Sequence, residues 1–257
     1  MQSPADSSRR GETTADPQDA EEPRMGANTR LSTMDSSTDA AATLSQLPED
    51  EARIMTLESI QGVNTVFLDL LWAGAQAGDL GFPFVEPLRS RVAALSDKTR
   101  KRLSQCGVLL VDACFTQAQR WRLIASEELR SDIARDTAQN HWLPEKEGML
   151  LVHSVLHIAW SVLKWNRQEA AFLLGVSTDT ARSIEALNVQ DLSRIAKHRS
   201  HWIQPRWADR PNAWAKLIEL VETSRADDSS PTLRALTLSM RLRETEDDFP
   251  AEDSEKV

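Results

Sequence analysis

The sequence has no tyrosine, only two cysteines and only nine glycines, and each shortage excludes a class of protein or site. Cys106 and Cys114 are not arranged as a Cys-x-x-Cys pair, which excludes a disulfide framework or a four-cysteine zinc site within this chain. No glycine-rich phosphate loop, Gly-x-Ser-x-Gly or His-Glu-x-x-His motif occurs. We therefore expect no enzymatic activity and no cofactor.

Long apolar runs are also missing. The sequence opens with the polar stretch MQSPADSSRRGETTADPQDA, which lacks the apolar region of a secretory signal. The most apolar run, MLLVHSVLHIAWSVL, contains two histidines and is too short to cross a bilayer. These features indicate a soluble cytoplasmic protein without a membrane partner.

The net charge of −9 is concentrated at the two ends of the chain. Residues 1–50 carry a net charge of −6 and residues 245–257 a net charge of −5, which leaves +2 for residues 51–244. The acidic ends favour solubility, while the slightly basic middle remains compatible with nucleic acid.

The middle of the chain has the pattern of an all-α fold. Apolar residues recur at helical spacing in two long segments, near 54–71 and near 151–162. Only CGVLLVDACF and HWIQPRW read as extended pieces, since β-branched runs are short. Residues 1–50 and 246–257 have few large apolar side chains, and we predict that both are disordered.

An internal repeat runs through this middle. VAALSDKTRKRLSQCGVLLVDACF (92–115) and IEALNVQDLSRIAKHRSHWIQPRW (184–207) align without gaps at an offset of 92. The interpretation divides the chain into a degenerate helical unit at 51–125, a connecting helix and loop at 126–147, and a second unit at 148–245. Chance matching of two amphipathic helical stretches is the alternative.

The stretch FLLGVSTDTARSIEAL, Phe172 to Leu187, is typical of a helix-turn-helix. Gly175 suits a turn residue with positive φ, and Ser177 suits the N-cap of the following helix. The outward face of that helix offers one cation, Arg182, beside Asp179, which would repel phosphate. We therefore expect a packing element, or at most a weak reader of bases.

A stronger basic signal follows in RIAKHRSHWIQPRW, Arg194 to Trp207, which contains no acid. Such patches contribute phosphate contacts, although a solvated helix face is the common alternative. Trp202 and Trp207 stand among these cations, and we predict that they contact a partner protein. The predicted DNA contacts are Arg182, Arg194, Lys197, Arg199 and Arg206.

His153 and His157 are four positions apart on a predicted helix and could share a metal ion. No third ligand follows at a suitable spacing. The sequence favours ordinary helix-face histidines, and we expect no metal site.

Three stretches of residues 148–245 carry a resemblance to a known family: LLVHSVLHIAW, FLLGVSTDTARSIEALNVQDLSRIAKHRSHWIQPRW and SRADDSSPTLRALTLSMRLRE. Over these residues the chain resembles the FlhD family. FlhD is the bacterial flagellar master-regulator subunit. The resemblance implies an all-helical dimer that works with FlhC in a heterohexamer and activates flagellar promoters. It also implies that FlhC carries the zinc and most of the DNA contacts, so that DNA contact by this chain depends on a partner.

The chain departs from the family in two ways. FlhD proteins are about half this length, and their extended segment has a cysteine that can cross-link the dimer, where this chain has Gln204. Our hypothesis is that two copies fold back as a pseudo-dimer of one chain, packed through their long helices. Two functions stay open: a transcriptional regulator subunit acting with an FlhC-like partner on promoter DNA, or an adaptor or antagonist that occupies such a partner without DNA. A homo-oligomer is compatible with both.

Overall fold

The computed structural model describes residues 48–78, 81–125 and 142–223, and over these residues the fold is mostly helical. The expectation of an all-α class is confirmed. The acidic tail at 246–257, residues 1–47 of the predicted N-terminal tail and residues 126–141 of the predicted connecting segment lie outside the described residues. So does the SMRLRE segment that contributed to the resemblance.

The elements follow one another from the N-terminal side of the described chain. They are α3 (Glu49–Ala77), α4 (Leu88–Ala93), α5 (Asp97–Ser104), β1 (Val111–Ala113), α6 (Ala118–Ala125), α8 (Glu145–Trp165), α9 (Arg167–Leu174), α10 (Thr178–Glu185), α11 (Val189–His198), the 3-10 helix η1 (Ser200–Trp202), β2 (Ile203–Pro205) and α12 (Pro211–Thr223).

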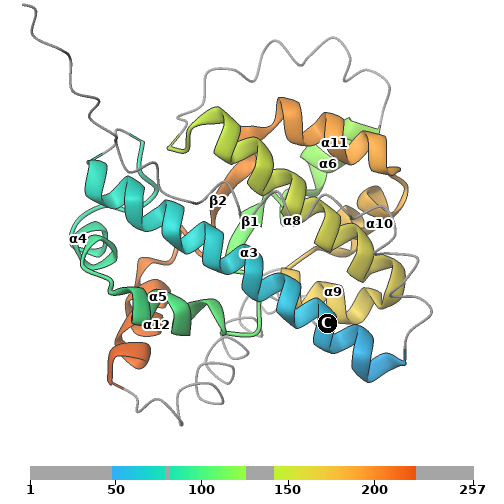
Figure 1. Cartoon of the computed structure of the whole chain (residues 1–257). Coiled ribbons are helices and arrows are strands. Elements are labelled where there is room, and N and C mark those ends of the chain that lie inside the picture. The colour runs from blue at the N-terminus through green and yellow to red at the C-terminus, as the bar shows by residue number, and fades with distance from the viewer. Residues whose placement is uncertain (1–47, 79–80, 126–141, 224–257) are drawn as a thin grey trace, which may run out of the picture.

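The two long helices, α3 and α8, pack against each other and run in opposite directions (Figure 1). α3 begins after Pro48 and ends at Gly78, whose φ of 75° is the left-handed conformation that glycine adopts easily. α8 begins after Pro144 with acidic residues in its first turn, where they complement the helix dipole. The pair forms one layer of the core.

α8 is longer than the apolar run that the sequence suggested. Its 21 residues are long and apolar enough to cross a membrane by length and composition alone. However, 67% of the most apolar window is buried inside the fold, against α3, α9, α10, α11 and both strands. In this structure α8 is therefore a core helix.

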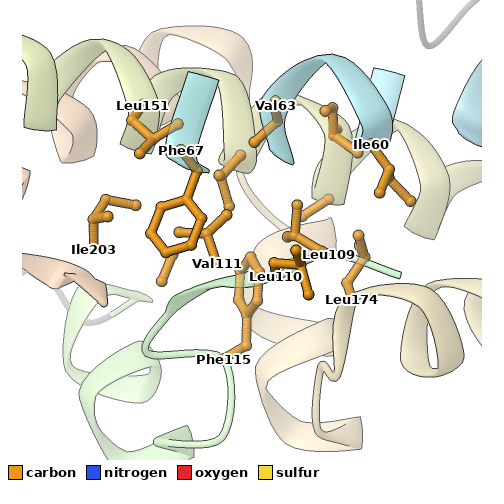
Figure 2. Packing of buried hydrophobic residues seen from close by; sticks show 14 of the residues in the cluster. Ile60, Val63, Phe67, Leu109, Leu110, Val111, Phe115, Leu151, Leu174 and Ile203 are labelled. Atoms are coloured by element: carbon orange, nitrogen blue, oxygen red, sulfur yellow. The ribbon is translucent and has the colours of Figure 1, made fainter. Parts of the chain in front are cut away.

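The two extended pieces predicted from the sequence pair with each other as β1 and β2. The pairing is antiparallel, and Asp112 stands opposite Gln204 at its centre, flanked by the pairs Val111–Pro205 and Ala113–Ile203. Figure 2 shows side chains of α3 and α8 meeting those of residues 109–115 beside this ribbon. The ribbon therefore lies at the centre of the core, with helices on both sides.

Asn64 of α3 joins the long helix to the segment that leads into β1. Its side chain is fully buried, donates to the carbonyl oxygen of Val108 at 2.8 Å, and accepts from the amide of Leu110 at 2.8 Å. These bonds satisfy main-chain groups that have no strand partner, which a buried loop requires.

Aligned positions of the two halves adopt the same local structure. α5 follows the N-cap Ser96, and α11 follows the N-cap Asn188, 92 positions later. The paired residues Asp112 and Gln204 are also 92 positions apart. An antiparallel pair centred on two equivalent residues has an approximate twofold axis at that centre.

The same correspondence continues beyond the strands with one extra residue in the second half. The indole N–H of Trp121 in α6 donates to the carbonyl of Cys114 at 2.9 Å, and that of Trp214 in α12 donates to the carbonyl of Arg206 at 2.6 Å. Both tryptophans are fully buried. Each therefore fixes a helix to the end of the strand that precedes it.

The two terminal helices cross between the halves. α12 packs on α4 and α5, while α6 packs on α10. On one side Arg102 donates to the carbonyl of Val221, and on the other Arg122 pairs with Asp179. Figure 1 shows the resulting groups, α4, α5 and α12 on one side of the ribbon and α6, α10 and α11 on the other.

Candidate nucleic-acid and partner interface

The helix-turn-helix predicted from the sequence is formed by α9 and α10. α9 ends at Gly175 with a φ of 75°, and the side chain of Ser177 accepts from the amide of Thr180 at the start of α10. Both predicted turn roles are confirmed. Across the turn, a hydrogen bond and the charge of Glu185 raise the pKa of Arg167, so this ion pair fastens α9 to α10.

The outward face of α10 offers little charge for DNA. Arg182 is exposed, but its guanidinium lies 3.6 Å from the carboxylate of Asp179, which also pairs with Arg122 of α6. The first turn of α10 is thus tied to a neighbouring helix by an ion pair. A recognition helix instead presents this turn to base edges. The arrangement supports a packing role for α10.

α11 carries the two remaining exposed cations of the predicted basic patch. Arg194 is about half exposed and pairs with Asp191 of the same helix at 2.9 Å, while Lys197 is exposed one turn further on. Asp191 also completes a capping box with Asn188 and so fixes the start of the helix. These two cations remain available to a phosphate backbone.

Arg199 and Arg206 do not belong to this surface, and their prediction as DNA contacts is wrong for this structure. Each is only 5% exposed, because after α11 the chain turns inward through η1 into β2. The guanidinium of Arg206 donates to the carbonyls of Leu109 and Leu173, both at 3.2 Å. The side chain of Arg206 therefore links the two halves of the core by hydrogen bonds and is not at the surface to bind phosphate.

Trp202 and Trp207 are likewise buried, at 3% and 5% exposure, so they do not form the partner surface predicted for them. Trp202 packs edge-on against Trp121 with 5.3 Å between ring centroids. The guanidinium of Arg206 lies 4.8 Å from the ring centroid of Trp207. The repeat aligns Trp207 with Phe115, which is fully buried in the structure. That alignment was the sequence signal for a core position.

A cavity of about 370 Å³ opens beside the centre of the ribbon, and sequence reasoning missed it. Its lining includes Asp112 and Gln117 from the first half and Gln204, Trp207 and Arg210 from the second. The amide of Gln204 donates to the carboxylate of Asp112 at 3.3 Å across the strand pair. No local motif reports such a cavity, because its residues come together only when the two halves meet.

His153 and His157 lie on the α11 side of α8, and their Nε2 atoms are 3.1 Å apart. The Nε2 atom of His153 is also 3.2 Å from the hydroxyl of Ser193 on α11. Over residues 48–78, 81–125 and 142–223, no group of three or more histidine, cysteine, aspartate or glutamate side chains is placed to hold a metal ion.

Comparison of this chain with protein-family models, with curated proteins and with solved structures gives no match.

Proposed function

We propose that this chain is an FlhD-like regulator subunit that acts with an FlhC-like partner on promoter DNA of flagellar or related genes. Residues 51–125 and 148–245 are two copies of one helical unit, folded in a single chain as a pseudo-dimer. The chain works in the cytoplasm without a membrane partner.

The observation that carries this proposal is the approximate twofold arrangement around the strand pair. Equivalent residues, Asp112 and Gln204, face each other at its centre. The long helices run antiparallel, and the terminal helices cross reciprocally between the halves. A symmetric homodimer has this organisation, with each surface patch repeated by its twofold axis.

The position of Gln204 gives independent support. In the family that the chain resembles, a cysteine at about this place can cross-link the dimer. A residue that bonds to its own copy in a symmetric dimer must lie close to the twofold axis. Gln204 lies at the centre of the ribbon, opposite Asp112, and this position supports the proposal.

DNA contact by this chain is secondary in our proposal. The predicted basic residues that remain at the surface are Arg182, Arg194 and Lys197, and two of them are paired with acids on their own helices. They suit phosphate contacts that position a complex, while base recognition belongs to the partner.

The alternative function, an adaptor or antagonist that occupies an FlhC-like partner without DNA, is favoured by one observation. Two of the five predicted DNA contacts, Arg199 and Arg206, are buried in the core, so this chain has fewer surface cations for DNA than the sequence suggested.

Fluorescence anisotropy on labelled promoter DNA separates these functions. The full chain is measured alone and with a co-expressed FlhC-like partner over a salt series. We expect tight binding only with both proteins present. If the partner alone binds DNA and releases it when this chain is added, the chain is an antagonist and not a regulator subunit. If the two proteins do not associate, both functions are wrong.

A variant carrying Arg182→Ala, Arg194→Ala and Lys197→Ala tests the basic surface within that complex. The logarithm of the affinity falls as the logarithm of the salt concentration rises, and each lost phosphate contact should make this slope shallower by about 0.9. The matched control replaces three other exposed cations, Arg53, Lys146 and Lys216, by alanine. We expect the control to keep the wild-type slope, and equal slopes for both variants would remove DNA contact from this surface.

A further inference from the structure

The histidine pair of α8 has the geometry of a metal chelate, although sequence reasoning favoured ordinary helix-face histidines. His153 and His157 stand one turn apart, with 4.3 Å between ring centroids and 3.1 Å between the Nε2 atoms. The same nitrogen of each ring therefore lies close enough to the other for both to reach one ion. Two histidines at this spacing on a helix form part of the ligand set in well-known zinc sites.

The separation of the two nitrogens agrees with the size of a coordination sphere. Imidazole nitrogens bind Zn²⁺ at about 2.0–2.1 Å. Two such ligands at angles between 90° and tetrahedral stand about 2.9–3.4 Å apart, from the same bond length. The observed 3.1 Å lies within this interval.

The rigid setting of the pair preorganises it. His157 is 7% exposed in the core helix α8, whose neighbours in sequence, Leu156 and Ile158, are also buried. His153 is half-buried and contacts Ser193 of α11, so the pair meets the surface at the seam between these helices. Metal ligands held on packed helices need little reorganisation before binding.

We propose that His153 and His157 form a two-histidine site for a divalent transition ion of the Zn²⁺, Ni²⁺ or Cu²⁺ class. Neutral imidazoles select these ions over Mg²⁺ and Ca²⁺, which prefer oxygen ligands. The hydroxyl of Ser193, 3.2 Å from the Nε2 atom of His153, is the nearest oxygen that could join the two nitrogens. This site is independent of the proposed regulatory function.

Isothermal titration calorimetry of the full chain, stripped of metal by a chelator, tests the site with Zn²⁺ and Ni²⁺. We expect one ion per chain. In His153→Gln the affinity should fall by about 100-fold or more, since loss of even an outer-shell partner of a ligand costs about 10- to 100-fold. His198→Gln, which removes an exposed histidine at the end of α11, is the matched control and should bind as the wild type does.

Electron paramagnetic resonance with Cu²⁺ identifies the ligands directly. We expect nitrogen couplings from two imidazoles in the wild type and in His198→Gln, and from at most one in His153→Gln. Circular dichroism establishes that each variant is folded before titration. No saturable binding by the wild type, or equal binding by the wild type and His153→Gln, would show a hydrogen-bonded histidine pair and overturn the proposal.

Discussion

Replacement of Arg206 by methionine separates a core role from a DNA-binding role. Methionine keeps the length and apolar volume of the side chain but removes the guanidinium that donates to Leu109 and Leu173. The carbonyl of Leu173 still accepts from the amide of Leu109 at 2.9 Å, whereas the carbonyl of Leu109 loses its Arg206 donor. In the variant the carbonyl of Leu109 therefore lacks a hydrogen-bond donor, while the carbonyl of Leu173 keeps one.

The magnitude follows from these contacts. A buried carbonyl without its donor costs about 1–3 kcal/mol. Loss of the cation beside the ring of Trp207, at 4.8 Å, costs about 0.5–2 kcal/mol more at a desolvated site. We expect Arg206→Met to lower the free energy of unfolding by about 1.5–5 kcal/mol, which lowers the melting temperature by about 3–20 °C for a chain of this size.

Urea denaturation followed by tryptophan fluorescence measures this change. The midpoint should fall while the dependence of the free energy on urea stays constant, because the surface exposed on unfolding is unchanged. Arg194→Met is the control, since Arg194 is exposed and its pairing with Asp191 contributes about 0–1 kcal/mol. Wild-type stability of Arg206→Met, together with weaker DNA binding by the complex, would refute the core role of Arg206.

Two further substitutions test buried contacts within each half of the core. Asn64→Leu leaves the amide of Leu110 without its buried acceptor, while the carbonyl of Val108 keeps the thiol of Cys106 at 3.1 Å, so we expect a loss of about 1–3 kcal/mol in urea denaturation. Thr65→Val on the same helix should cost less than about 0.5 kcal/mol, and equal effects would contradict this account. Gly175→Ala places a Cβ atom 2.6 Å from the guanidinium of Arg206 at a φ of 75°, and we expect a melting temperature lower by several degrees in calorimetry. An unchanged melting temperature would mean that the turn tolerates side chains.

Local patterns predicted the features that depend on neighbouring residues. The helical class, the turn at Gly175, the cap at Ser177 and the two extended pieces all follow from residues within a few positions of each other. Their physical causes, positive φ, capping and periodicity, act within the segment itself. These predictions are confirmed.

The predictions that failed required the direction of a side chain. Arg194 and Arg199 both look like members of one basic run, yet one is exposed and the other is buried. The difference arises because α11 ends at His198 and the chain then turns toward the core. The sequence gives the charge of each residue, but its exposure depends on how the segment after α11 packs against α8.

The distance between the histidine nitrogens was also beyond sequence reasoning. A spacing of four positions allows His153 and His157 to converge, but it equally allows both rings to point apart into solvent. The choice depends on rotamers set by the packing of α8 against α11. The sequence pattern therefore identifies the pair, whereas the 3.1 Å distance between its nitrogens follows from the packing of the helices.

The pairing of β1 with β2 has a consequence for how binding surfaces evolve. Two separate subunits of identical sequence must duplicate every mutation, so a new patch always arises twice. Here both strands belong to one polypeptide, and association of the halves needs no second molecule. One side of the ribbon can therefore differ from the other, and position 206 carries a buried arginine where the aligned position carries the buried Cys114. A chain built this way can present a different face to each neighbour, and its complexes need not be symmetric.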